Sequence, residues 1–215
     1  MVTVIDTILQ SLILGVATGC VYGLFSLGLA MNAGVMKIIN YAHGEFLMLA
    51  LYSSFWLNRL FGIEAVASAL ITAPLFLFVG FAVYEVFILR IIDAPPQSQA
   101  AVTLGLAILL QNLAMAWWTT ITRTVPYSIV HGTIAIGPYA LPQSRLAAAV
   151  VSIVVVTITH MFLTKTELGT AMRAVAEDKE AGALMGINIK NVFSFSFGLG
   201  LALNAVAASL IITFH

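Results

Sequence analysis

Few residues of this chain could take part in catalysis or contact a polar solute, and three of them precede an apolar run. These are Asn40, His43 and Glu45. His43 and Glu45 are only two positions apart, so they do not share a helical face. No H-E-x-x-H motif and no third ligand accompany them, so we expect no metal site. A structural turn, in which Glu45 favours a helix start through the dipole, and a place on a transport path both stay open.

Two further polar residues, Gln111 and Asn112, lie in the middle of an apolar run. A polar side chain at the centre of a bilayer costs free energy unless it is paired, so it faces protein or a water-filled path. Hydrogen bonding between helices and lining of a translocation route are both compatible with this position. Asn204, in the last apolar run, has the same two interpretations.

The composition indicates which solvent surrounds these residues. The chain is 61% hydrophobic and 8% charged, whereas soluble domains are about 25% charged. So little polar surface cannot cover a soluble fold, which predicts an integral membrane protein. The formal net charge of zero argues against a nucleic-acid partner. The single Cys20 excludes an intramolecular disulfide and a cysteine-built metal site.

The apolar runs predict an all-α polytopic membrane protein with about six transmembrane helices, because a lone spanning segment must satisfy its own backbone groups. The runs are 8–30, 46–60, 65–89, 100–121, 146–163 and 192–214. The second run reaches the length of a span only if 41–45 joins it, and it is otherwise re-entrant. The first run is too long for a signal peptide, so we expect a retained span. A small hairpin or an irregular cap is expected within 129–138.

Small residues recur at every fourth position of the first run, at Ser11, Gly15, Gly19 and Gly23. This spacing predicts a groove that admits another helix backbone closely. The partner is either another helix of the same chain or a second subunit.

The segment from Lys165 to Lys190 holds eight of the eighteen Asp, Glu, Lys and Arg residues of the chain. Thr166 and Asp178 are suitable N-caps and Gly186 a suitable stop, which predicts two short amphipathic helices. Their apolar stripe is Leu168, Met172 and Val175. An ordinary interfacial loop is one interpretation. In the other, the stripe fills a groove of a cytoplasmic partner.

The Lys and Arg residues predict the orientation. If all six runs span, one side carries Lys37, Arg90, Lys165, Arg173, Lys179 and Lys190, and the other carries Arg59, Arg123 and Arg145. The richer side is expected to be cytoplasmic, with the N-terminus external. The chain has no G-x-x-x-x-G-K-[ST] motif, so we expect no ATP site of its own and no cofactor in this chain.

Two stretches resemble the branched-chain amino acid ABC transporter permeases: NAGVMKIINYAHGEFLMLALY (Asn32–Tyr52) and LGTAMRAVAEDKEAGALMGINIKNVFSFSF (Leu168–Phe197). The resemblance covers essentially the whole chain, which is expected to be shortened at its C-terminal end relative to the family. It implies a single transmembrane permease domain over 1–215, in the cytoplasmic (inner) membrane of a bacterium, with a cytoplasmic coupling loop at 164–191.

The resemblance also implies partners: P-loop ATPase subunits that bind the ATP, a second related permease and an external solute-binding protein. It assigns a set of residues to ATPase docking, namely Gly169, Arg173, Ala174, Asp178, Ala181, Gly186 and Ile187. The expected substrate is a branched-chain or related amino acid. A permease of the same group for urea or short amides is an alternative. An ion-coupled secondary carrier is another, but it would need a charged residue deep in a span, and none is evident.

Overall fold

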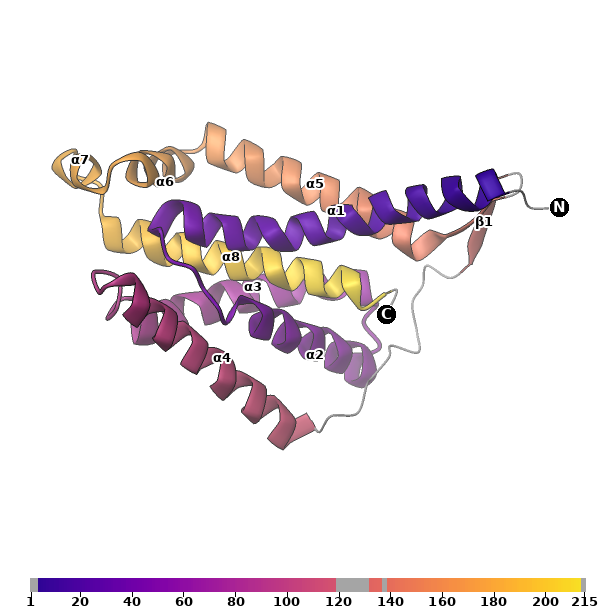
Figure 1. Cartoon of the computed structure of the whole chain (residues 1–215), viewed down its shortest axis with the longest axis horizontal. Helices are drawn as coiled ribbons and strands as arrows, with labels where there is room; N and C mark the ends of the chain where they lie inside the picture. The colour runs from indigo at the N-terminus through magenta and orange to yellow at the C-terminus, as the bar shows by residue number, and fades with distance from the viewer. Residues whose placement is uncertain (1–3, 119–131, 137–138, 214–215) are drawn as a thin grey trace.

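The computed structural model describes residues 4–118, 132–136 and 139–213, which form an elongated bundle of helices (Figure 1). The helices are α1 (Val4–Met36), α2 (His43–Phe61), α3 (Ala65–Val83), the π-helical turn η1 (Tyr84–Ile88), α4 (Pro96–Trp118), α5 (Gln143–Lys165), α6 (Glu167–Glu177), α7 (Lys179–Leu184) and α8 (Ile189–Ile211). The strands β1 (Thr133–Ile136) and β2 (Tyr139–Pro142) pair antiparallel, so the hairpin alternative is the one observed, four residues further along than expected.

The predicted all-α membrane architecture is confirmed. Within the described residues, five helices are long and apolar enough to cross a membrane: α1, α3 with η1, α4, α5 and α8. The remaining segment, α2, is 19 residues long, with Glu45 in its first turn and Arg59 in its last.

The segment that contains α2 crosses the bundle as a broken element. After α1 the chain turns at Lys37, whose φ is 57°, and it is non-helical to Ala42. The nitrogen Nε2 of His43, at the start of α2, lies 3.3 Å from the carbonyl oxygen of Phe25, well inside α1. From there α2 runs to the end of the bundle where α8 also ends (Figure 1). The second segment therefore passes through the bundle, and its first part is not helical.

The two ends of the bundle differ in character. The start of α1, the β1–β2 hairpin and the end of α8 lie at one end, here called the hairpin end (Figure 1). Helices α6 and α7, here called the protrusion (Glu167–Leu184), lie at the other. The end of α1 and the α3–α4 turn share that protrusion end, so it collects the six basic residues expected on one side. The positive-inside rule predicts the cytoplasm on the side of the protrusion end.

Helix α8 is the centre of the bundle, and glycine lets its neighbours approach its backbone. A Cβ on Gly80 of α3 would lie 2.5 Å from the Cα of Gly198. A Cβ on Gly28 of α1 would lie 2.5 Å from the carbonyl oxygen of Gly200. No side chain fits in either contact, so α8 touches α1 and α3 backbone to backbone, as small residues allow in membranes.

A cluster of hydroxyl groups joins α2, α3 and α8 towards the hairpin end. The Ser209 Oγ lies 2.8 Å from Ser54 Oγ, 3.2 Å from Ser68 Oγ and 3.1 Å from Thr72 Oγ1. All four residues are fully buried. Hydrogen bonds between membrane helices contribute about 0.6 kcal/mol each on average, so this cluster fixes the relative position of three helices.

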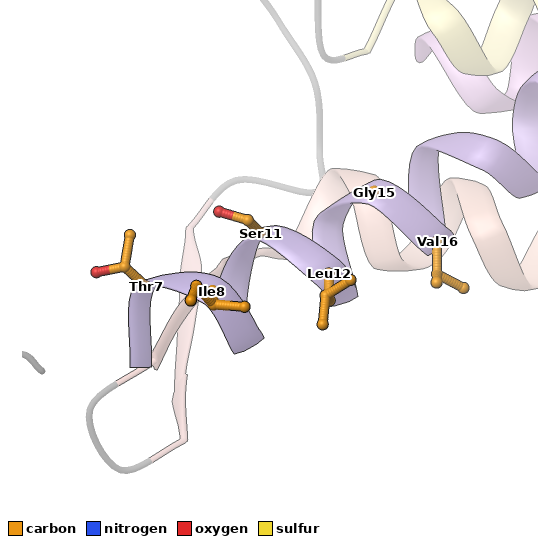
Figure 2. A pocket seen from close by; sticks show the side chains of 6 residues that line it. All are labelled: Thr7, Ile8, Ser11, Leu12, Gly15 and Val16. Carbon is orange, nitrogen blue, oxygen red and sulfur yellow. The ribbon is translucent and has the colours of Figure 1, made fainter. Parts of the chain in front are cut away.

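The glycines that the sequence singled out on α1 do not pack against another helix of the described chain. A Cβ on Gly15, Gly19 or Gly23 would meet nothing within 4 Å, so no helix of the described chain fills this face. Figure 2 shows its outer part, where Ser11, Gly15 and their neighbours line an open groove of about 480 Å³. The face is free for a second subunit or for lipid.

The glycine contacts predict opposite effects for two Gly→Ala substitutions. Gly80→Ala forces α3 and α8 apart, since the atom it meets is backbone, and overpacking costs about 1–3 kcal/mol. Gly105→Ala on α4 is the matched control, because its Cβ would meet nothing within 4 Å; helix propensity alone predicts a gain of up to about 1 kcal/mol. Thermal unfolding in detergent measures both, and equal midpoints would contradict the packing described.

Candidate functional site

The protrusion folds as its sequence predicted. Thr166 Oγ1 accepts a hydrogen bond from the Gly169 amide at 3.0 Å and caps α6. Asp178 Oδ1 accepts from the amides of Glu180 and Ala181 and caps α7. Gly186, whose φ is 83°, follows the end of α7. These caps pair the free amides at two helix starts, so both short helices keep their form next to water.

The apolar side of α6 packs against this chain and not against a partner. Met172 and Val175 are buried in the main core. A Cβ on Gly169 would lie 2.5 Å from the Cα of Leu163, so α6 lies directly on the end of α5. The prediction that the stripe Leu168, Met172 and Val175 fills a partner's groove is therefore wrong for Met172 and Val175. A helix this short is stable only when its apolar face packs against the rest of the chain.

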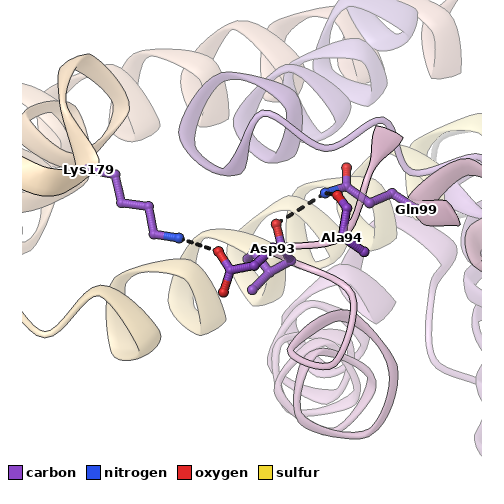
Figure 3. A network of polar contacts seen from close by, with 5 residues as sticks. Asp93, Ala94, Gln99 and Lys179 are labelled. Atoms are coloured by element: carbon purple, nitrogen blue, oxygen red, sulfur yellow. Dashed lines mark hydrogen bonds and ion pairs between the residues drawn. The ribbon is translucent and has the colours of Figure 1, made fainter. Parts of the chain in front are cut away.

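Ion pairs connect the protrusion end to neighbouring helices. Lys179 Nζ lies 2.7 Å from Asp93 Oδ1 in the α3–α4 turn (Figure 3). The Gln99 side chain donates to the carbonyl oxygens of Ile92 and Ala94 and closes that turn. At the start of α8, Lys190 Nζ lies 3.1 Å from Glu85 Oε2 in η1. The first pair joins α7 to the α3–α4 turn, and the second joins the start of α8 to η1.

The predicted docking residues divide into two groups. Arg173, Ala174, Asp178, Ala181 and Gly186 are exposed, whereas Gly169 is buried and Ile187 partly buried. The first group can meet a partner, and the second positions the protrusion.

Sequence reasoning missed the most exposed apolar side chains of the protrusion. Leu184 is 89% exposed and Met185 83% exposed, at the end of α7. The signal in the sequence was an apolar pair inside a strongly charged segment. Large apolar side chains this exposed, on the aqueous side of a membrane protein, mark a contact surface.

A second group of polar residues is buried where α1, α2 and α8 meet, and we call it the polar seam: Asn32, His43 and Asn204. Asn204 Nδ2 donates to the His43 carbonyl oxygen at 2.9 Å. A Cβ on Gly200 would lie 2.7 Å from Asn32 Oδ1, and one on Gly28 would lie 3.4 Å from His43 Cε1. Asn32 and Asn204 are fully buried and His43 nearly so.

Most side-chain polar atoms of the seam have no hydrogen-bond partner among the residues that the structure describes. Both carboxamide atoms of Asn32, the Nδ1 of His43 and the Oδ1 of Asn204 are buried and unpaired. Such atoms cost about 1–3 kcal/mol each when left without a partner. Buried polar groups are paired in most proteins, so these atoms require an explanation.

Comparison with known proteins identifies the chain. Residues 11–214 match the family described as "Branched-chain amino acid transport system / permease component". The chain belongs to this family. The permease is 28% identical over 215 residues to the high-affinity branched-chain amino acid transport system permease protein BraD of Pseudomonas aeruginosa, covering 94% of this chain and 70% of BraD. It is 30% identical over 224 residues to the corresponding protein LivH of Escherichia coli K12, covering 96% and 71%. No solved structure matches it.

The residues predicted to line a transport path are not all brought together in the permease. Asn40 and His43 are buried at the start of α2, while Glu45 is partly exposed. Gln111 and Asn112 are exposed on α4, and the Asn112 side chain bonds only its own helix, at the Ile108 carbonyl oxygen. Asn32 was missed because the first apolar run was expected to end at residue 30, whereas α1 continues to Met36.

Exchanging the charges of Lys179 and Asp93 tests the role of their ion pair. Both side chains are largely exposed, so we expect a coupling free energy of only about 0.2–1 kcal/mol in a double-mutant cycle on unfolding. Lys179→Asp and Asp93→Lys each weaken ATP-driven uptake by the assembled permease, and the double substitution restores it. Uptake that stays low in the double variant would show that the charges act separately.

Proposed function

We propose that this permease is the membrane subunit of an importer that carries branched-chain amino acids across the cytoplasmic membrane. Partner P-loop ATPases supply the energy, an external binding protein supplies the solute, and a second related permease completes the path. Family membership over 11–214 and the names of its relatives support this proposal.

One observation carries the energy-coupling part of the proposal: the exposed pair Leu184 and Met185 at the tip of the protrusion. Arg173, Asp178 and Ala181 of the protrusion are exposed as well. An exposed apolar pair in a charged segment is the pattern expected of a docking surface, since the apolar pair supplies affinity and the charges set register.

Two contacts connect the protrusion to the bundle, so we expect a movement of the protrusion to reach the bundle. Gly169 holds α6 against α5, and Lys179 holds α7 near the α3–α4 turn. A partner ATPase that pulls on Leu184 and Met185 therefore acts on α5 and on the α3–α4 turn together. This is how a subunit without its own ATP site can change the side on which a path opens.

Charged substitutions at the tip test the docking surface. Leu184→Glu with Met185→Glu is expected to reduce co-purification of the ATPase by tenfold or more, since loss of a buried anchor costs about 2 kcal/mol or more. Leucine uptake falls with it, because the permease is no longer driven. Arg173→Glu is expected to weaken association less.

The control for this experiment is Ile134→Glu, an exposed apolar residue of the hairpin at the opposite end. It leaves ATPase association unchanged. All variants insert equally in the membrane, as a fluorescent fusion reports. Undiminished ATPase binding by the Leu184 and Met185 variant would rule out this surface.

A further inference from the structure

Two copies of one seven-residue motif contribute Asn32 and Asn204 to the polar seam. Leu27-Gly28-Leu29-Ala30-Met31-Asn32-Ala33 on α1 and Leu199-Gly200-Leu201-Ala202-Leu203-Asn204-Ala205 on α8 differ only at Met31 and Leu203. The two helices run in opposite directions (Figure 1). The chain thus presents one Gly-x-x-x-Asn face from each helix, inverted with respect to the other. Inverted repeats meet at the solute site in many transporters.

The two motifs pack on each other through their glycines. A Cβ on Gly28 would meet the Gly200 carbonyl oxygen, and a Cβ on Gly200 would lie 2.7 Å from the Gly28 carbonyl oxygen. Each asparagine lies one turn after its glycine, on the same face. The side chain of Asn32 lies against Gly200, and Asn204 lies one turn further along α8, so a separation of α1 from α8 at these glycines would expose both carboxamides.

The depth of the seam matches that of a solute site. Gly200 is the central residue of the 23-residue α8, which is about 34 Å long and spans the hydrocarbon layer. The start of α2 lies at the same level, because the His43 carbonyl oxygen binds Asn204 and the ring of His43 lies beside Gly28. A helix start inside the membrane directs the positive end of its dipole at this point.

The unpaired atoms indicate the chemistry of the ligand. Asn32 Nδ2 is a donor, Asn32 Oδ1 and Asn204 Oδ1 are acceptors, and His43 Nδ1 can serve as either. A carboxylate suits the donor and the α2 start, and an ammonium group suits the two carboxamide oxygens. Glu45 in the same turn of α2 is partly exposed, outside this buried group.

We infer that Asn32, His43 and Asn204 form a binding site for the zwitterionic head group of an α-amino acid, uncovered when α1 and α8 separate during transport. The inference rests on the proposed function and adds to it the place in the chain where the solute is held. Residues outside the seam contact the apolar side chain of the solute. The seam therefore selects for the amino-acid head group rather than for one amino acid.

Cysteine labelling tests whether the seam opens and what enters it. In a Cys20→Ser background, Asn32→Cys and Asn204→Cys are introduced singly into the full complex with its ATPases and binding protein. A small methanethiosulfonate reagent is expected to label both positions during ATP turnover. Leucine slows the labelling about tenfold or more, as expected for loss of access at a charge-assisted site. 4-Methylpentanoate, without the amino group, and isopentylamine, without the carboxylate, do not slow it.

Ser209→Cys is the matched control, because Ser209 is as fully buried on α8 but belongs to the hydroxyl cluster. It stays unlabelled. Uptake of leucine by the unsubstituted complex checks the proposed function separately. If that complex transports leucine while both seam cysteines stay unreactive, or react at a rate that leucine does not change, the seam is a closed structural contact and the inference is overturned.

A second pair of variants gives a readout that does not depend on cysteine. Asn204→Leu is expected to raise the apparent KM for leucine about tenfold or more, since it removes hydrogen bonds to a charged group. Ser196→Ala, which loses only the bond to the Met31 carbonyl oxygen in the same α1–α8 contact, leaves KM unchanged. A parallel loss in both variants would indicate that the contact serves packing alone.

Discussion

The bundle depends on direct backbone contact between α8 and its two neighbours. Gly198 and Gly200 let α3 and α1 approach α8 until no side chain fits between them. In lipid there is no hydrophobic force to drive helices together, so close packing and hydrogen bonds must do so. The buried hydroxyl cluster and the start of α2 add hydrogen bonds to α8 beside these two contacts.

The polar groups of the interior fall into two kinds. Around Ser209 the hydroxyls of α2, α3 and α8 bond one another, so that region is fixed. Around Asn32 and Asn204 most polar atoms are unpaired. The satisfied group lies towards the hairpin end and the unsatisfied one at mid-depth. A transporter needs both kinds, because one group of helices must stay in place while polar groups elsewhere exchange hydrogen-bond partners.

Few residues hold the two short helices of the protrusion on the bundle. A helix as short as α7 has little stability of its own. Thr166 and Asp178 cap α6 and α7, the buried side chains of α6 pack in the core, and Lys179 joins α7 to Asp93 in the α3–α4 turn. Leu184 and Met185 are then free to face outward, since α6 already supplies the buried apolar contacts.

The sequence alone determined the lipid environment, the helical class, the hairpin, both caps of the protrusion and the side on which the basic residues gather. These depend on composition and on neighbours a few positions away, which a sequence displays directly. Only the tertiary structure decided which glycines pack: Gly28, Gly80, Gly198 and Gly200, and not the regular series Gly15, Gly19 and Gly23. It also decided that Met172 and Val175 face inward and that Asn32 joins His43 and Asn204. Each of these depends on which helix lies opposite, and residues more than 150 positions apart in the chain, such as His43 and Asn204, become neighbours only when the bundle closes.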